Sequence, residues 1–177
     1  GNLGNVYGDM GYIAKAKEFY QQALVRYRQL GAWRIEGLIH NNMGAITFYV
    51  GDYESAKIEY EKSFRIKKEV RDVRGQSVAL NNLGELYNAI HQPQKGLAHA
   101  KQGYELAKGI GAQFWVAYNQ HTIGESLLLL SEWEKAVEMF AQVVDLRREL
   151  LHEGFLMESL ASWLWARWKQ GDDLASL

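Results

Sequence analysis

The chain has 177 residues, of which 47% are hydrophobic and 23% are charged, and its formal net charge is −1. This length and apolar content can build a buried core, which excludes a disordered chain, and a charge near zero excludes non-specific nucleic-acid binding, which needs a strong positive excess. Cysteine is absent, so disulfides, thiolate metal sites and cysteine nucleophiles are excluded. The uncharged stretch 38–50 is too short and too polar to span a bilayer, so we expect neither a nucleic-acid nor a membrane partner.

Signals that end one helix and start the next recur every 20 residues. Glycine stands at 11, 31, 51, 111 and 171, and the other turn positions hold Arg71-Asp72, His91-Gln92-Pro93 and Ser131. Between these points apolar residues follow helical spacing, as from Ala136 through Val144 to Leu146, without β-type alternation. In chain order this predicts helices near residues 13–30, 33–50, 53–71, 73–90, 93–110, 113–130, 133–150 and 153–170. The chain is therefore expected to be all-α.

A longer period of 40 residues groups these helices into pairs. Glycine recurs at 4, 44, 84 and 124, and the position 16 residues later is aromatic at 20, 60 and 140 but alanine at 100. A glycine inside a helix costs roughly 1 kcal/mol relative to alanine, so four in register need a packing reason. We expect each to mark a close crossing of two antiparallel helices, such as Gly44 opposite Ala56 with Tyr60 beside it. A phosphate-binding loop would need a preceding strand and clustered glycines, and the pattern has neither.

The repeat resembles the tetratricopeptide repeat. The resemblance is carried by a set of three motifs, namely Leu3-Gly4…Tyr7 and Leu83-Gly84…Tyr87 in first helices, Gly51-Asp52-Tyr53 at a turn, and Ala56…Tyr60…Ser63 in a second helix. The unit has 40 residues instead of the common 34. It resembles the variety found in kinesin light chains, spindle-orientation adaptors and bacterial signalling regulators. HEAT and armadillo units have similar lengths, but they do not explain the glycine and aromatic register.

The resemblance implies an α-solenoid of antiparallel helix pairs, wound as a right-handed superhelix of about four and a half repeats. A single array would cover residues 1–177, with units near 1–32 (partial), 33–72, 73–112, 113–152 and 153–177 (partial). In this register Gly1 falls in the middle of a first helix and Leu177 one turn into a second helix. We therefore expect a fragment of a longer protein.

The resemblance also implies that the first helices line a concave groove. Their segments carry few charges, since 38–50 has none, 75–90 has only Glu85 and 112–131 has only Glu125. The function expected is a protein- or peptide-binding scaffold within a larger regulatory or signalling protein, holding an extended segment in this groove. The residues expected to line it are Asn41, Asn42, Ala45, Phe48, Tyr49, Asn81, Asn82, Glu85, Asn88, His121, Glu125, Leu128, Trp165 and Trp168.

The residue types at these positions limit the kinds of partner that the groove can bind. Chaperone-binding relatives hold a peptide carboxylate with lysine and arginine at these positions, but here the only charges are acidic, so we expect a neutral or basic protein or peptide segment. The repeated asparagines form a ladder that either binds a peptide backbone or caps neighbouring helices. Trp165 and Trp168 align with Glu85 and Asn88, and they form either an aromatic floor of the groove or a surface that packs against another part of the longer protein.

No catalytic pattern is present, and we expect no enzyme, no cofactor and no metal. The histidines do not form a His-Glu-x-x-His pair; His91 and His99 are expected to be exposed, and His40 and His121 to approach the groove. Glu85 and Glu125 share one register position on neighbouring first helices. An open, wet groove would raise the pKa of neither carboxyl group, which argues against general acid–base chemistry.

Two other functions remain open from the sequence. One is a peptide-pheromone receptor or sensor array of a bacterial regulator, and the other is a structural array that self-associates through its truncated ends. In each case a cytoplasmic location is expected.

Overall fold

The computed structural model describes residues 2–151 and 153–172. Within these ranges the chain forms nine helices: α1 (Asn2–Asp9), α2 (Ile13–Gln29), α3 (Trp33–Tyr49), α4 (Tyr53–Glu69), α5 (Val73–Ala89), α6 (Pro93–Gly109), α7 (Gln113–Leu129), α8 (Trp133–Glu149) and α9 (Glu153–Gln170). The eight predicted helices all form, and they start at the predicted residues. The second helix expected near the end of the chain falls on residues 173–177, which lie outside the described residues.

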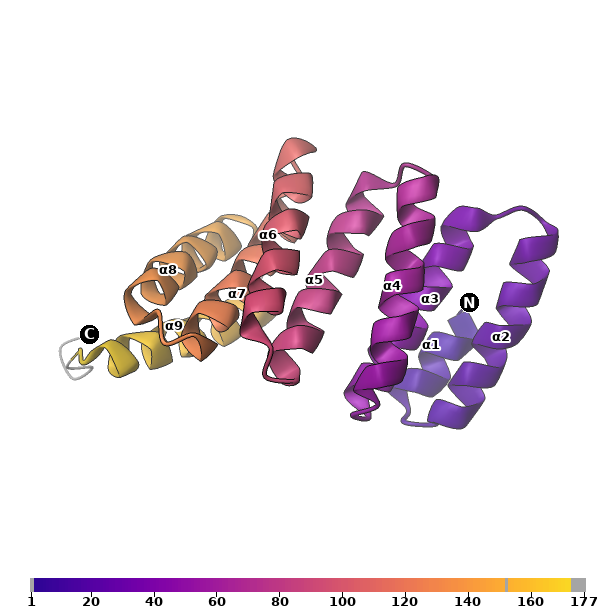
Figure 1. The fold of residues 1–177 in the computed structure, drawn as a ribbon, viewed down its shortest axis with the longest axis horizontal. Helices are drawn as coiled ribbons and strands as arrows, with labels where there is room; N and C mark the ends of the chain where they lie inside the picture. Colours follow the sequence, from indigo (N-terminus) through magenta and orange to yellow (C-terminus); the bar gives the residue numbers. More distant parts are fainter. Residues whose placement is uncertain (1, 152, 173–177) are drawn as a thin grey trace.

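The helices stack side by side into an elongated array (Figure 1). Each pair of consecutive helices is joined by a three-residue turn, so neighbours run antiparallel. Odd-numbered helices also contact the next odd-numbered helix, as α3 does α5 and α5 does α7, whereas within the described ranges the even-numbered helices stand farther apart from one another. The array therefore curves toward the side formed by α1, α3, α5, α7 and α9, which we call the odd-helix face. This architecture confirms the expected all-α solenoid of antiparallel pairs.

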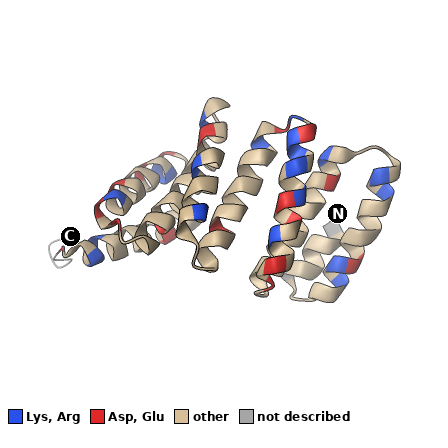
Figure 2. Ribbon diagram, viewed as in Figure 1, with Lys and Arg blue, Asp and Glu red and all other residues tan. Residues whose placement is uncertain are grey.

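Charge is distributed as the helix register predicts. Figure 2 shows lysine, arginine, aspartate and glutamate along α4, whereas α5 is mostly uncharged. The charge-poor segments predicted on the first helices therefore lie on the odd-helix face.

The turns explain the 20-residue period. The residue after each helix cap has a positive φ, at Gly11, Gly31, Gly51, Gly111 and Gly171 and also at Arg71, His91, Ser131 and Leu151. In the turn after α3, the N–H of Gly51 donates to the carbonyl of Phe48 and the N–H of Asp52 donates to that of Thr47. These two bonds satisfy carbonyls that the helix end leaves unpaired, and they require the left-handed conformation at residue 51. Glycine adopts it without strain, which explains the predicted glycine positions.

The 40-residue glycine register has a packing cause. A Cβ on Gly4, Gly44 or Gly124 would collide with the aromatic ring 16 residues later, on the helix that follows. Gly84 faces Ala100 instead, and the two backbones come closer there, so that a Cβ on Gly84 would lie 3.2 Å from the carbonyl oxygen of Gly96. The predicted close crossings are thus confirmed, with the aromatic ring as the main partner of the glycine.

Candidate functional site

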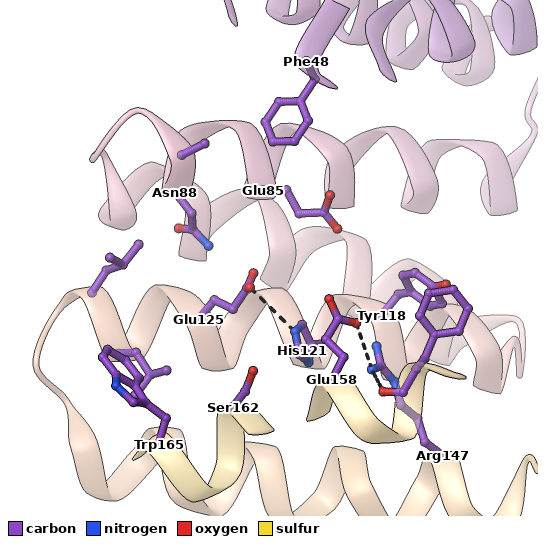
Figure 3. Close-up of a pocket in the computed structure, with 14 residues that line it drawn as sticks. Phe48, Glu85, Asn88, Tyr118, His121, Glu125, Arg147, Glu158, Ser162 and Trp165 are labelled. Atoms are coloured by element: carbon purple, nitrogen blue, oxygen red, sulfur yellow. Dashed lines mark hydrogen bonds and ion pairs between the residues drawn. The ribbon is translucent and has the colours of Figure 1, made fainter. Parts of the chain in front are cut away.

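A cavity of about 660 Å³ opens on the odd-helix face (Figure 3). Its lining comes from α3, α5, α7 and α9, with one residue from α8. The lining residues are Phe48, Glu85, Asn88, Ala89, Tyr118, His121, Glu125, Leu128, Leu129, Arg147, Phe155, Glu158, Ser162 and Trp165. Residues far apart in the chain meet here because successive odd-numbered helices lie side by side on the inner side of the curve.

The predicted groove residues divide among three locations. The cavity brings together Phe48, Glu85, Asn88, His121, Glu125, Leu128 and Trp165. Ala45 and Tyr49 line a second cavity of about 560 Å³ near the end of α1, with Gly8, Met10, Gly11, Ile13 and Ile46. Asn41, Asn42, Asn81, Asn82 and Trp168 line neither of these two cavities.

The asparagine ladder joins helices to one another. Asn42 donates from Nδ2 to Oδ1 of Asn5 on α1 at 3.0 Å. On the next unit Asn82 donates from Nδ2 to Oδ1 of Asn41 at 2.8 Å. Further along, Thr122 on α7 donates from Oγ1 to Oδ1 of Asn81 at 3.0 Å. The amides therefore link α1, α3, α5 and α7 in the way that one of the two interpretations expects, and their contact with a ligand stays a prediction.

Asn88 ties α5 to α7 at the edge of the cavity. Its Nδ2 donates to the backbone carbonyl of Thr122 at 3.3 Å, and its Oδ1 accepts from Oγ of Ser126 at 2.9 Å. Because Asn88 is buried and uses both ends of its amide, it positions the cavity wall.

The expectation that the groove raises the pKa of neither Glu85 nor Glu125 is wrong for Glu85. Burial and the nearby charge of Glu125 raise the pKa of Glu85 to about 7, although a hydrogen bond from Nδ2 of Asn81 at 2.6 Å opposes that shift. Glu85 is partly buried on the inner side of the array, where it shares a cavity with Glu125 and with apolar side chains such as Phe48 and Leu128. Glu125 and Glu158 face the same cavity from α7 and α9 (Figure 3).

His121 is buried in the cavity wall. Its Nδ1 lies 3.2 Å from Oγ of Ser159, and its Nε2 lies 3.7 Å from Oε1 of Glu125, too far for a hydrogen bond. The Nε2 atom has no hydrogen-bond partner within the described part of the chain. This places His121 at the cavity, as the sequence predicted.

Arg147 corrects the expectation that the groove carries only acidic charge. It reaches the cavity from α8 and is 2% exposed, and its Nη1 donates to Oγ of Ser159 at 2.6 Å and to the carbonyl of Phe155. Oε2 of Glu158 lies 3.5 Å away, and the guanidinium sits 5.4 Å from the ring centre of Tyr118. The buried side of α8, which carries apolar residues such as Phe140 and Val144, ends with the charged Arg147. Its neighbour Leu146 is only partly buried.

Two histidines lie elsewhere than expected. His40 is buried against α4, with Nδ1 2.6 Å from Oε2 of Glu59, and so does not reach the groove. His99 is partly buried and stacks on Tyr87 at 5.2 Å between ring centres, and burial lowers its pKa. In both cases the ring fills a gap between helices, which the repeat register does not reveal. His91 is exposed as predicted.

The tryptophans of α9 differ in their surroundings. Trp165 is 46% exposed and closes one end of the cavity, whereas Trp168 is 56% exposed and lies outside it. Nζ of Lys169 lies 5.3 Å and 4.8 Å from their ring centres. Trp163 packs against the core around Leu127 and Phe140. An aromatic contribution to the cavity thus rests on Trp165, and its role in ligand binding stays a prediction.

Sequence reasoning missed several lining residues, namely Ala89, Tyr118, Leu129, Arg147, Phe155, Glu158 and Ser162. Two signals were available. Ser162 shares its register with Asn42 and Asn82, and Arg147 is a charge at a position where α8 otherwise carries buried apolar residues. Among the described residues no three histidine, aspartate or glutamate side chains are placed to hold a metal ion. No helix in the described ranges is both long and apolar enough to cross a membrane.

Comparison with known proteins gives one family. The sequence model described as the tetratricopeptide repeat matches residues 1–69, 36–109 and 75–149. The solved structure of BtubC (BKLC) from P. vanneervenii is similar, with 18% identity over 96% of this chain and 71% of that chain and a TM-score of 0.84. A putative kinesin light chain from Podosopora anserina with nearly identical TPR-like repeats is also similar, with 16% identity over 96% of this chain and 84% of that chain and a TM-score of 0.74.

At these identities the likeness to solved structures concerns the fold alone. No curated protein matches the sequence. Three observations indicate the same family. They are the sequence motifs, the antiparallel helix pairs, and a family model that matches overlapping segments from residue 1 to residue 149. The chain belongs to the tetratricopeptide repeat family.

Proposed function

We propose that the chain binds an extended, neutral or basic segment of a partner protein along its odd-helix face, with the cavity between α5, α7 and α9 as the main contact site. Tetratricopeptide repeats are protein-interaction scaffolds, and the fold is in general a non-catalytic module. The proposal is more specific than that general role in three ways. It names the binding surface, it gives the ligand as an extended segment, and it places the scaffold within a larger regulatory protein.

The observation that carries the proposal is a cavity built across several repeats. Its volume of about 660 Å³ lies within the range of roughly 300–1,000 Å³ that is usual for binding pockets. Solenoids use the surface on the inner side of their curvature for binding, because that surface offers side chains from many repeats to one extended ligand. Phe48, Leu128 and Trp165 supply apolar contact area, and carboxylates supply the polar contacts.

The experiment is a selection of a displayed random 12-residue peptide library on the immobilised chain. Peptides that bind are synthesised, and their contact sites are mapped by amide chemical shifts. We expect the shifts to fall on α5, α7 and α9, and Trp165→Ala to weaken binding at least tenfold. Trp168→Ala is the matched control, because Trp168 is also an exposed tryptophan of α9 but lies outside the cavity.

Two results would contradict the proposal. One is a set of selected peptides whose shifts map to the even-numbered helices, and the other is equal affinity for the parent chain and for Trp165→Ala. Melting temperatures of both variants are measured beside the affinities, so that a loss of binding is not confused with a loss of fold.

A further inference from the structure

The cavity gathers acidic side chains from three successive odd-numbered helices. Glu85 comes from α5, Glu125 from α7 and Glu158 from α9, and Figure 3 shows their carboxyl groups directed toward a common space. A cluster of this kind is stable only when cations or protons offset the repulsion between its members.

The arginine that lines the cavity is already committed elsewhere. The Nη1 of Arg147 donates to Ser159 and to the Phe155 carbonyl, and the guanidinium is 5.4 Å and 5.6 Å from the ring centres of Tyr118 and Phe155. The carboxylate near it is that of Glu158, at 3.5 Å. Arg147 is 2% exposed, and its guanidinium is held at the α8–α9 side of the cavity, where Glu158 is the carboxylate nearest to it.

Glu85 and Glu125 are left short of positive charge. The hydrogen bond described for Glu85 comes from the neutral amide of Asn81, and the ring of His121 faces Glu125 with its Nε2 3.7 Å from the carboxylate, too far for a hydrogen bond. The consequence is visible at Glu85, whose pKa rises to about 7 because of burial and the charge of Glu125. A partly buried carboxyl group whose pKa is raised by burial and by a neighbouring carboxylate marks a place where an added cation would be stabilised.

A second observation also indicates a missing ligand group. His121 is 6% exposed, and its Nε2 faces the cavity beside Glu125 without a hydrogen bond to any described residue. Buried polar atoms are normally paired, so an unpaired one in a cavity wall is a position for a ligand atom. The apolar walls formed by Phe48, Leu128 and Trp165 complete a space suited to a charged group on an aliphatic stem.

We propose that this cavity binds a single basic side chain, arginine or lysine, of the partner segment, with its cationic group between Glu85 and Glu125 and its stem against Phe48, Leu128 and Trp165. This inference rests on the proposed function and adds the residue type that the site selects. Acidic side chains are rejected, because they would add to the carboxylates already present.

Binding of a cation is expected to strengthen as pH rises through about 7. At pH 6 the cation must displace the proton of Glu85, whereas at pH 8 the carboxylate is already ionised. The other groups that face Glu85 are Tyr60 on α4, Tyr118, His121 and Glu125 on α7, Arg147 on α8 and Glu158 on α9. Arg147 keeps its charge throughout this range.

The test uses two small probes, Nα-acetyl-arginine methylamide and its citrulline counterpart, which has the same shape without the charge. The indole N–H signal of Trp165, assigned with Trp165→Phe, reports binding during an NMR titration. We expect the arginine probe to bind at least fivefold more tightly than the citrulline probe at pH 8, and the difference to shrink at pH 6. Glu85→Gln should lower the affinity for the arginine probe at least fivefold and leave the citrulline probe unchanged.

Glu105→Gln is the control variant, because it removes the same charge from an exposed position on α6. The inference is overturned if both probes bind equally, if neither perturbs Trp165, or if Glu105→Gln weakens binding as much as Glu85→Gln. These results are distinct from failure of the proposed function. Selected peptides that bind the odd-helix face without a basic residue would leave that function intact while removing the basic anchor.

Discussion

The ring of Tyr60 on α4 lies directly over Gly44 on α3, so close that a Cβ added to Gly44 would stand 2.5 Å from Cδ1 of the ring. The same relationship holds between Gly4 and Tyr20 and between Gly124 and Phe140. The glycine lets the two helices of a unit approach until the aromatic ring fills the crossing. The 40-residue register of glycines therefore results from the packing of a ring against a glycine within a helix pair.

Gly44→Ala is expected to lower the free energy of unfolding by about 2 kcal/mol, since the added methyl group must displace a buried ring. Gly109→Ala is the control, because a Cβ there meets no atom within 4 Å, and this change should raise stability by a few tenths of a kcal/mol up to about 1 kcal/mol. Denaturant unfolding followed by circular dichroism measures both. A Gly44→Ala protein as stable as the parent would contradict the packing role.

Arg71→Gly is expected to stabilise the fold by roughly 0.5–1 kcal/mol, because Arg71 is held at a φ of 54° where a side chain is strained. Gly51→Ala tests the same effect in reverse at the preceding turn, where φ is 80° and no atom lies near the added Cβ. It should destabilise by about 1 kcal/mol. If both changes shift the denaturation midpoint in the same direction, backbone strain at these turns is not the cause.

Asp72→Ala is expected to cost about 2 kcal/mol, because the side chain has two partners. It accepts from the Gly75 N–H at 3.0 Å at the start of α5 and from Nζ of Lys67 at 2.9 Å, and Lys67 is buried. Asp52→Ala is the matched control at the preceding turn, where the carboxylate is exposed and caps Ser55. Asp52 lies 3.9 Å from Lys17 in an exposed ion pair, which contributes little, so the loss should be smaller there. The difference between the two unfolding free energies then reflects mainly the buried partner Lys67.

Because of the Asp72 carboxylate, we expect the protein to lose stability in acid. Burial alone would raise the pKa of Asp72, but the hydrogen bonds from Lys67 and the Gly75 N–H outweigh it and hold the pKa below 3.8. A carboxyl group with a lowered folded pKa stabilises the protein above its unfolded pKa, and this stability disappears as pH falls through the folded value. Asp72→Ala should therefore remove part of the acid sensitivity measured between pH 5 and pH 2.

Glu85→Gln is expected to change the pH dependence of stability in the opposite direction. The folded pKa of about 7 lies above the ordinary value of 4.5, so the folded state holds more protons and the parent protein loses stability as pH rises between these values. The variant should lack this loss and be more stable than the parent at pH 8 by about 1–2 kcal/mol, a figure reduced for partial exposure to water. Unfolding at pH 5 and pH 8 measures it, and an identical pH slope in both proteins would contradict the raised pKa.

The helices were predictable because their signals are local. A glycine at Gly51 ends a helix through its own backbone freedom, and Asp52 starts the next through its own side chain. The repetition of these signals every 20 residues fixed the helix boundaries and, through the 40-residue register, the pairing of helices.

The cavity could be predicted only in part. The register correctly brought Glu85, His121 and Glu125 to one face, because these residues recur at fixed positions on successive first helices. It left open whether the Asn41 and Asn82 amides join neighbouring helices or bind a ligand, and their pairing across one full repeat appears only in the structure. Such pairings depend on how closely neighbouring units stack, which is a property of the assembled array.

The sequence by itself determined the family, the helix boundaries, the positions of the turns and the face on which the cavity lies, because each of these depends on residue type and spacing along the chain. Only the tertiary structure decided that Arg147 reaches the cavity from α8 and that partial burial beside Glu125 raises the pKa of Glu85. Burial and charge at a point in space depend on side chains from several different helices. The curvature of the array brings those side chains together, and with them the chemistry that the proposed ligand must match.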